Sequence, residues 1–219
     1  GCALIGSIIG VASAGIISDR FGRKKAMLFS AFMFSLSAIG CAVCNGFTQL
    51  VVYRIIGGVG IGVVSIVSPM YISEVAMAQR RGTLVSLYQL AITMGFLFAY
   101  LINWLILGVA ENAAADPSCR LASDFSNKLF VDEYWRGMLG SETIPALLFF
   151  FIIFLIPESP RWLIVRGRGA EATAVLQRIY VTADEAERQK AVTEESISGE
   201  AKSEWKALLS PGIMKAVLI

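Results

Sequence analysis

The sequence contains no histidine, the side chain most often used to hold metals and to move protons near neutral pH. It has no G-x-x-x-x-G-K phosphate loop and no nucleophile elbow, and its glycine-rich run at 57–62 does not follow a predicted strand. It also lacks the clustered basic run that is typical of a nucleic-acid-binding arm. We therefore expect a protein that is not an enzyme, with no metal, no cofactor and no nucleic-acid partner.

Charge is scarce as well, at 16% of the residues, whereas globular domains carry about 25%. Hydrophobic residues make up 56% of the chain, and they fall in blocks that are long enough to cross a bilayer. This pattern predicts an all-α, multi-pass membrane protein whose surroundings are the lipid bilayer.

Cysteine is the next scarce residue, with four at positions 2, 41, 44 and 119. Cys41 and Cys44 have the C-x-x-C spacing of redox and metal sites, but they lie in an apolar segment without a second pair of metal ligands. Ordinary membrane-buried thiols are the favoured interpretation. A disulfide from Cys119 to the outer end of that segment is left open.

The short basic stretch Gly15–Lys25 separates the first two apolar blocks and sets the predicted orientation. Arg20, Arg23, Lys24 and Lys25 cannot enter hydrocarbon, and a cationic loop between two spanning helices stays in the cytoplasm. The alternative is a basic turn between core helices of a soluble protein, but the flanking blocks are too long and too apolar for it.

Five apolar segments are predicted to span the membrane. They are Gly1–Ser18, Ala26–Cys44, Leu50–Ile72, Thr83–Leu107 and Trp135–Ile156. Small residues recur every four positions in the first segment, which lets helix backbones approach closely in lipid. They form the rows Gly6-Gly10-Ala14 and Ser7-Val11-Gly15. The uncharged turn at 45–49 and the acidic loop Gly108–Tyr134 suit the outer side.

The domain organisation predicted from this pattern has three parts. Residues 1–156 form the membrane helices, and residues 157–211 form a charged cytoplasmic insert with short amphipathic helices. Residues 212–219 begin another apolar helix. Because the sequence starts and stops inside apolar runs, we expect a fragment of a larger membrane protein.

Two ionisable residues lie well inside predicted spans, where charge is costly and usually marks function or pairing. Arg54 is roughly 6 Å and Glu142 roughly 10 Å below the outer surface, at about 1.5 Å per residue. Opposite charges at comparable depth predict an ion pair. If another carboxylate competes for Arg54, proton binding becomes coupled to helix movement. The alternative is a static pair that only locks two helices together.

A polar and aromatic stripe lies on one face of the fourth segment. Its members are Gln89, Ile92, Thr93, Phe96 and Tyr100. An amide facing lipid would lack hydrogen-bond partners, whereas two donors and an acceptor suit the hydroxyl groups of a sugar. The stripe either lines a sugar path or holds helices together, and the pattern alone does not separate these alternatives.

Seven motifs in order over nearly the whole chain resemble the sugar porter family of the major facilitator superfamily. They are Gly15–Lys25, Arg54–Gly58, Pro69–Glu74 with Arg81-Gly82, Gln89–Gly95, Trp135–Met138, Glu142–Leu147 and Pro157–Leu163. The stretch Ser141–Phe149 and the long outer loop are most similar to the bacterial D-xylose–proton symporter branch. Phe96 departs from that branch, which has an amide there.

The resemblance implies a major facilitator fold in which this chain covers helices two to six, the cytoplasmic insert and the start of helix seven. The first helix and the C-terminal half of the same protein would then be missing partners. It implies a sugar contact at Gln89 and proton coupling at Arg54 and Glu142. Thr93 and Phe96, which share the helix face of Gln89, are the further candidate sugar contacts. It also implies a cytoplasmic charge network that latches the outward-facing state, made of Asp19, Arg23, Glu74, Arg81, Glu158 and Arg161.

The function expected from the resemblance is symport of a monosaccharide, pentose or hexose, with a proton across the bacterial inner membrane by alternating access. A facilitative sugar uniporter with a structural Arg54–Glu142 pair is the first alternative. A sugar sensor that does not transport is the second.

Overall fold

The structure, a computed structural model, describes residues 1–77, 79–116, 123–180 and 182–199. Cys119 and the expected helix start at 212–219 lie outside these residues. The chain forms two compact units, Gly1–Trp162 and Leu163–Ile219, which are taken separately below. The boundary places residues 157–162 with the apolar helices, six residues beyond the predicted end of the membrane part.

The predicted all-α fold is confirmed, and the described residues contain no strand. Within the described residues, four helices and one pair of helices are long and apolar enough to cross a membrane. They are α1 (Cys2–Phe21), α2 (Arg23–Val43), α3 (Phe47–Val75), α4 (Arg81–Ala115) and the span Tyr134–Leu155. Each predicted apolar segment corresponds to one of these five spans.

Two of the predicted loops between membrane helices are longer than the loops in the structure. Only Gly22, with a φ of 100°, separates α1 from α2, so the cations at 23–25 are helical and not part of a loop. The expected loop Gly108–Tyr134 begins with the last turns of α4, because the alanines at 113–115 favour helix. It also contains α5 (Asp124–Asn127) and a π-helical turn, η2 (Lys128–Asp132).

The last span was predicted as one helix but is divided into α6 (Tyr134–Gly140) and α7 (Thr143–Leu155). Pro145 has no N–H to donate to the Ser141 carbonyl, which instead receives the Ile144 N–H at 3.4 Å. The break falls at Ser141 and Glu142. One of the two membrane-depth ionisable residues therefore lies at a helix N-terminus.

The close approach of α1 to α3 depends on glycine. A Cβ atom added to Gly6 would lie 2.1 Å from the Ile55 carbonyl oxygen, and one added to Gly58 would lie 2.1 Å from the Ala3 carbonyl oxygen. The row of Gly6, Gly10 and Ala14 is buried as predicted. The second row stays partly exposed, since Val11 is 45% exposed.

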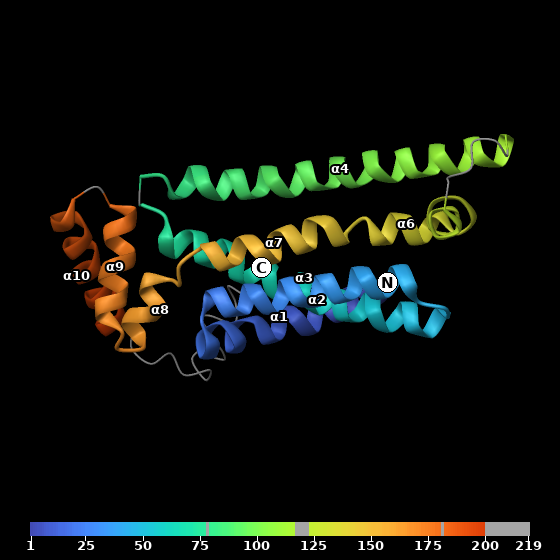
Figure 1. Cartoon of the computed structure of the whole chain (residues 1–219). Helices are drawn as coiled ribbons and strands as arrows, with labels where there is room; N and C mark the ends of the chain where they lie inside the picture. Colours follow the sequence, from blue (N-terminus) through green and yellow to red (C-terminus); the bar gives the residue numbers. More distant parts are fainter. Residues whose placement is uncertain (78, 117–122, 181, 200–219) are drawn as a thin grey trace, which may run out of the picture. The chain divides into compact units, whose positions relative to one another are not determined.

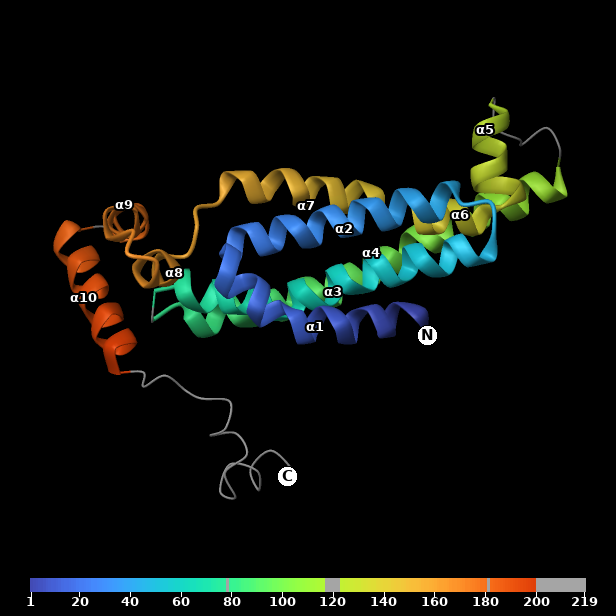
Figure 2. The same cartoon turned by 90° about the horizontal axis from the view of Figure 1, so that it is seen from below.

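Helix α2 lies between α3 and α7, and its contacts with both form the core (Figures 1 and 2). The buried side chains of this core are alanines, β-branched residues and one methionine: Ala14, Ala26, Met27, Ala31, Val63, Val67 and Ile153. By contrast, the buried residues of α4 are confined to its last third, at Ile106, Ala110 and Ala113.

The described part of the second unit contains helices. The described helices are α9 (Gly169–Ile179) and α10 (Ala183–Gly199), which pack against each other. The six-residue helix α8 (Pro160–Val165) crosses the boundary between the two units. Ala172 and Leu176 form the buried side of the amphipathic α9.

Candidate functional site

The two ionisable residues at membrane depth lie together. The Arg54 Nη1 atom on α3 is 3.8 Å from the Glu142 Oε1 atom at the start of α7. The pair is loosely held, with 38% of the Arg54 side chain and 61% of the Glu142 side chain exposed in this chain. The predicted ion pair is present. Its proposed part in proton coupling stays a prediction.

A cavity of about 310 Å³ adjoins this pair. Its walls come from α1, α2, α3 and α7, and they are apolar apart from Ser37 and the pair itself. Gly57 and Gly58 form part of its lining on the α3 side. Arg54 and Glu142 therefore face a space that a mobile polar group can enter.

The predicted sugar-contacting residues Gln89, Thr93 and Phe96 lie along α4, with Phe96 63% exposed. The Thr93 hydroxyl donates to the Gln89 carbonyl oxygen of its own helix at 3.2 Å. The described chain leaves all three side chains exposed, so their role as sugar contacts stays a prediction.

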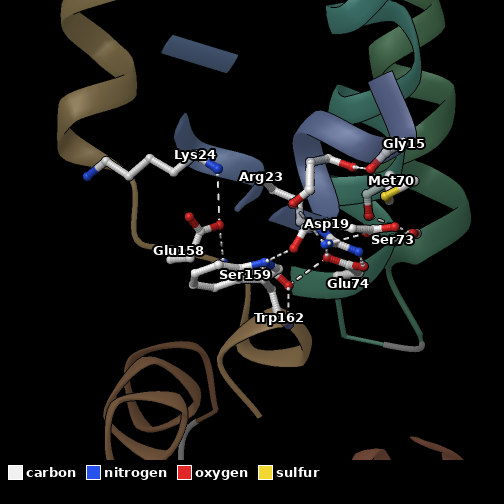
Figure 3. A network of polar contacts seen from close by, with 11 residues as sticks. Gly15, Asp19, Arg23, Lys24, Met70, Ser73, Glu74, Glu158, Ser159 and Trp162 are labelled. Carbon is white, nitrogen blue, oxygen red and sulfur yellow. Dashed lines mark hydrogen bonds and ion pairs between the residues drawn. The ribbon is translucent and has the colours of Figure 1, made fainter. Parts of the chain in front are cut away.

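A polar network lies at the end of the first unit that carries Gly22 (Figure 3). Arg23 holds Glu74 with two hydrogen bonds, from Nε to Oε2 at 3.0 Å and from Nη2 to Oε1 at 2.9 Å. Both side chains are almost buried, at 10% and 9% exposed. Arg23 Nη1 also donates to Asp19 Oδ1 at 3.1 Å and to the Ser18 carbonyl oxygen at 3.2 Å. One guanidinium thus joins α1, α2 and α3.

The segment Glu158–Trp162 completes this network (Figure 3). Glu158 Oε1 accepts the backbone N–H groups of Lys24 and Ser159, both at 3.0 Å. The Ser159 hydroxyl donates to Glu74 Oε2 at 2.6 Å, and the Trp162 indole N–H donates to the Asp19 carbonyl oxygen at 2.9 Å. The segment therefore binds the ends of α1, α2 and α3.

One residue expected in the network has different surroundings. Arg81 is exposed at the start of α4 and forms no ion pair with the described part of the chain. Arg161 is half-buried in α8, beside Trp162. The structure thus brings together Asp19, Arg23, Glu74 and Glu158 but leaves Arg81 outside.

Ser159 and Arg136 were missed as candidate residues. Ser159 is fully buried and accepts the Trp162 N–H at 3.4 Å, as the cap of α8. A serine directly before a proline is a recognisable helix start, and that signal was available in the sequence. Arg136 is 7% exposed, donates to Glu133 at 2.7 Å and stacks 4.6 Å from the Trp135 ring. No local pattern around Arg136 indicates its burial.

The cysteines fit the interpretation as ordinary thiols. Cys41 and Cys44 are free and buried, and Cys2 is half-buried and free. The described residues contain no group of histidine, cysteine or acidic side chains arranged to hold a metal.

Five membrane-length helical spans, an ion pair at membrane depth and a charge network at one end of the bundle define a polytopic α-helical membrane protein of the transporter type. The family model described as "Sugar (and other) transporter" matches residues 1–219. The chain belongs to this family of sugar transporters.

Three relatives show how far the similarity extends. A glucose transport protein of Synechocystis is 42% identical over 177 residues, covering 81% of this chain and 36% of the relative. A D-xylose-proton symporter of Escherichia coli K12 is 40% identical over 195 residues, covering 81% and 37%. An arabinose-proton symporter of Bacillus subtilis is 37% identical over 216 residues, covering 99% and 43%. The chain thus spans well under half the length of these curated relatives.

Solved structures show the same fold. A proton:xylose symporter of the major facilitator superfamily, bound to 6-bromo-6-deoxy-D-glucose, matches with a TM-score of 0.80 and 37% identity, over 95% of this chain and 44% of that one. A partially occluded, inward-open xylose transporter of Escherichia coli matches with a TM-score of 0.75 and 38% identity, over 90% and 47%. The fold is that of the matched part of a major facilitator protein.

Proposed function

We propose that this chain forms part of a monosaccharide–proton symporter of the inner membrane, which works by alternating access. By the complete transporter we mean this chain together with the segments that its relatives have beyond it, including a first helix and a second half. The relatives named as xylose–proton and arabinose–proton symporters support both the sugar and the proton. The cytoplasmic side is the end that carries Gly22 and its cations.

The observation that carries the proposal is the loose Arg54–Glu142 pair beside a cavity. At 3.8 Å and with half-exposed side chains, the pair leaves carboxylate lone pairs and guanidinium N–H groups available to a third group. A carboxylate from the missing first helix can compete for Arg54, so that its protonation changes which helices the arginine holds. A static structural pair would instead be short and buried, as Arg23–Glu74 is.

The coupling role is tested by Glu142→Gln in the complete transporter. We expect uptake against a gradient to fall at least tenfold, while exchange of labelled sugar across the membrane changes less than threefold. Proton-driven uptake and exchange are measured in the same proteoliposomes. Equal losses in both would show that the pair is structural and would favour the uniporter.

The sugar site is tested by Gln89→Ala. An amide that bonds sugar hydroxyls contributes about 0.5–1.5 kcal/mol, so the affinity should fall roughly two- to tenfold with normal expression. Binding of D-xylose and D-glucose is measured by equilibrium titration. Thr83→Ala, at the start of the same helix, is the matched control. If Gln89→Ala leaves the affinity unchanged for every sugar that the transporter carries, Gln89 is not a sugar contact.

A further inference from the structure

The inner end of α2 has no side-chain cap of its own, because Gly22 precedes it. The backbone N–H of Lys24, which has no acceptor within the first turn of the helix, donates instead to the carboxylate of Glu158, 134 residues further along the chain. The carboxylate sits directly over Gly22, where an added Cβ would be 2.3 Å from Glu158 Oε2. A negative group therefore occupies the position where the N-terminal end of a helix favours one.

The outer end of α2 is capped in the opposite sense, by a positively charged side chain that donates to backbone carbonyl groups. Arg136 Nη1 donates to the Ala42 carbonyl oxygen at 3.3 Å and to the Cys44 carbonyl oxygen. Ala42 lies in the last turn of α2 and Cys44 is its C-cap residue, and carbonyl groups at the C-terminal end of a helix have no partner within it. Glu133 fixes the guanidinium through Nε, and the Trp135 ring covers it. A cation at the C-terminal end of a helix complements its dipole.

Both capping residues flank the same neighbouring span. Arg136 lies in α6, Glu158 follows α7, and α2 packs against both helices along the intervening length. The α6–α7 break at Ser141–Glu142 would allow the two halves of this span to move separately. The two caps place a fixed point on each side of that break.

We propose that the α6–α7 span caps both ends of α2, with Glu158 at the N-terminal end and Arg136 at the C-terminal end, and so holds the two as one body. Glu158 acts as an acceptor for backbone N–H groups at this position. Gly22 is required because the carboxylate occupies the space of a side chain. Arg54 and Glu142 can then move relative to each other while the scaffold on either side of them stays fixed.

The cap at Glu158 is tested by amide hydrogen exchange of the complete transporter in lipid nanodiscs. Glu158→Ala should raise the exchange rate of the Lys24 amide about fivefold, the effect of losing a cap. Glu158→Asp, one methylene shorter, should do the same, whereas Glu158→Gln keeps an acceptor oxygen and should change the rate less than twofold. Lys25→Gln, which removes the neighbouring charge from an exposed side chain and leaves residue 24 unchanged, is the control. Equal rates in Glu158→Gln and Glu158→Ala, or no change in any variant, would overturn the capping role.

The one-body claim has its own measurement, the distance between spin labels at Phe32 on α2 and Phe151 on α7, which are 52% and 64% exposed. The wild type should give one narrow distance, and the double variant Arg136→Met with Glu158→Ala should at least double its width. An unchanged width alongside faster Lys24 exchange would leave the caps but overturn the one-body claim. Neither measurement uses transport, so failure here leaves the proposed symport untouched.

Discussion

Two arginine–glutamate pairs in this chain differ in how tightly they are held. Arg23 and Glu74 are almost buried and share two hydrogen bonds, whereas Arg54 and Glu142 are 3.8 Å apart and half-exposed. Breaking a buried pair costs about 3–5 kcal/mol because a charge is left without a partner. The first pair therefore suits a permanent joint, and the second suits an exchange of partners.

Ser159 makes the Arg23–Glu74 joint dependent on the α7 end. Ser159→Ala removes its bond to Glu74 and the cap of α8, and we expect a loss of about 1–3 kcal/mol in stability. Thermal unfolding in detergent measures this loss. Ser65→Ala is the matched control, because its hydroxyl bonds only the Ile61 carbonyl of its own helix. Equal melting temperatures for the two variants would show that the Ser159 contact carries no stability.

At the scale of elements, apolar block length predicted all five spans, and the rows of small residues on α1 predicted a close helix contact, whose partner is α3 in the structure. Proline was harder to interpret. Pro69 lies inside the unbroken α3, whereas Pro145 lies in the first turn of α7, where a missing N–H costs nothing. Whether a proline lies within a continuous helix or at a helix break depends on the packing of neighbouring helices, which the sequence does not show.

The side-chain network was only partly predictable for the same reason. Asp19, Arg23, Glu74 and Glu158 were recognised from motifs, but the bond from Glu158 to the Lys24 backbone joins residues far apart in the chain. The burial of Arg136 likewise arises from the end of α2. Such contacts come from packing, which local patterns do not specify.

The contact between α1 and α3 predicts a position-dependent effect of adding one methyl group. Gly58→Ala should destabilise the protein by about 1–3 kcal/mol, since the new Cβ meets the Ala3 carbonyl and the helices must separate. Gly108→Ala in α4, where nothing lies within 4 Å of the added atom, should be neutral or slightly stabilising. Melting temperatures of the two variants test this, and a loss at Gly108 as large as at Gly58 would contradict it.

At the scale of the whole molecule, the alternating access that we propose for the complete transporter requires the Gly22 end of the bundle to close and open in each cycle. Asp19 is suited to a contact that is made and released, because its side chain is 72% exposed while Arg23 stays anchored to Glu74. Because the Asp19 carboxylate is exposed to solvent, its pair with Arg23 contributes about 0–1 kcal/mol, and losing it hardly affects folding. Its effect should fall on the balance between outward- and inward-facing states.

Asp19→Asn in the complete transporter should therefore lower the maximal transport rate at least fivefold. The sugar affinity should stay within twofold of the wild type. The melting temperature should stay within about 2 °C, as expected for a loss of stability below 1 kcal/mol. Uptake in proteoliposomes and equilibrium titration separate the two quantities. Glu171→Gln, which removes an exposed pair with Arg168 in the second unit, should leave both unchanged. A fall in sugar affinity as large as the fall in transport rate would place Asp19 in sugar binding and not in the closing contact. A group that acts only on the balance between outward- and inward-facing states changes the transport rate more than it changes the sugar affinity.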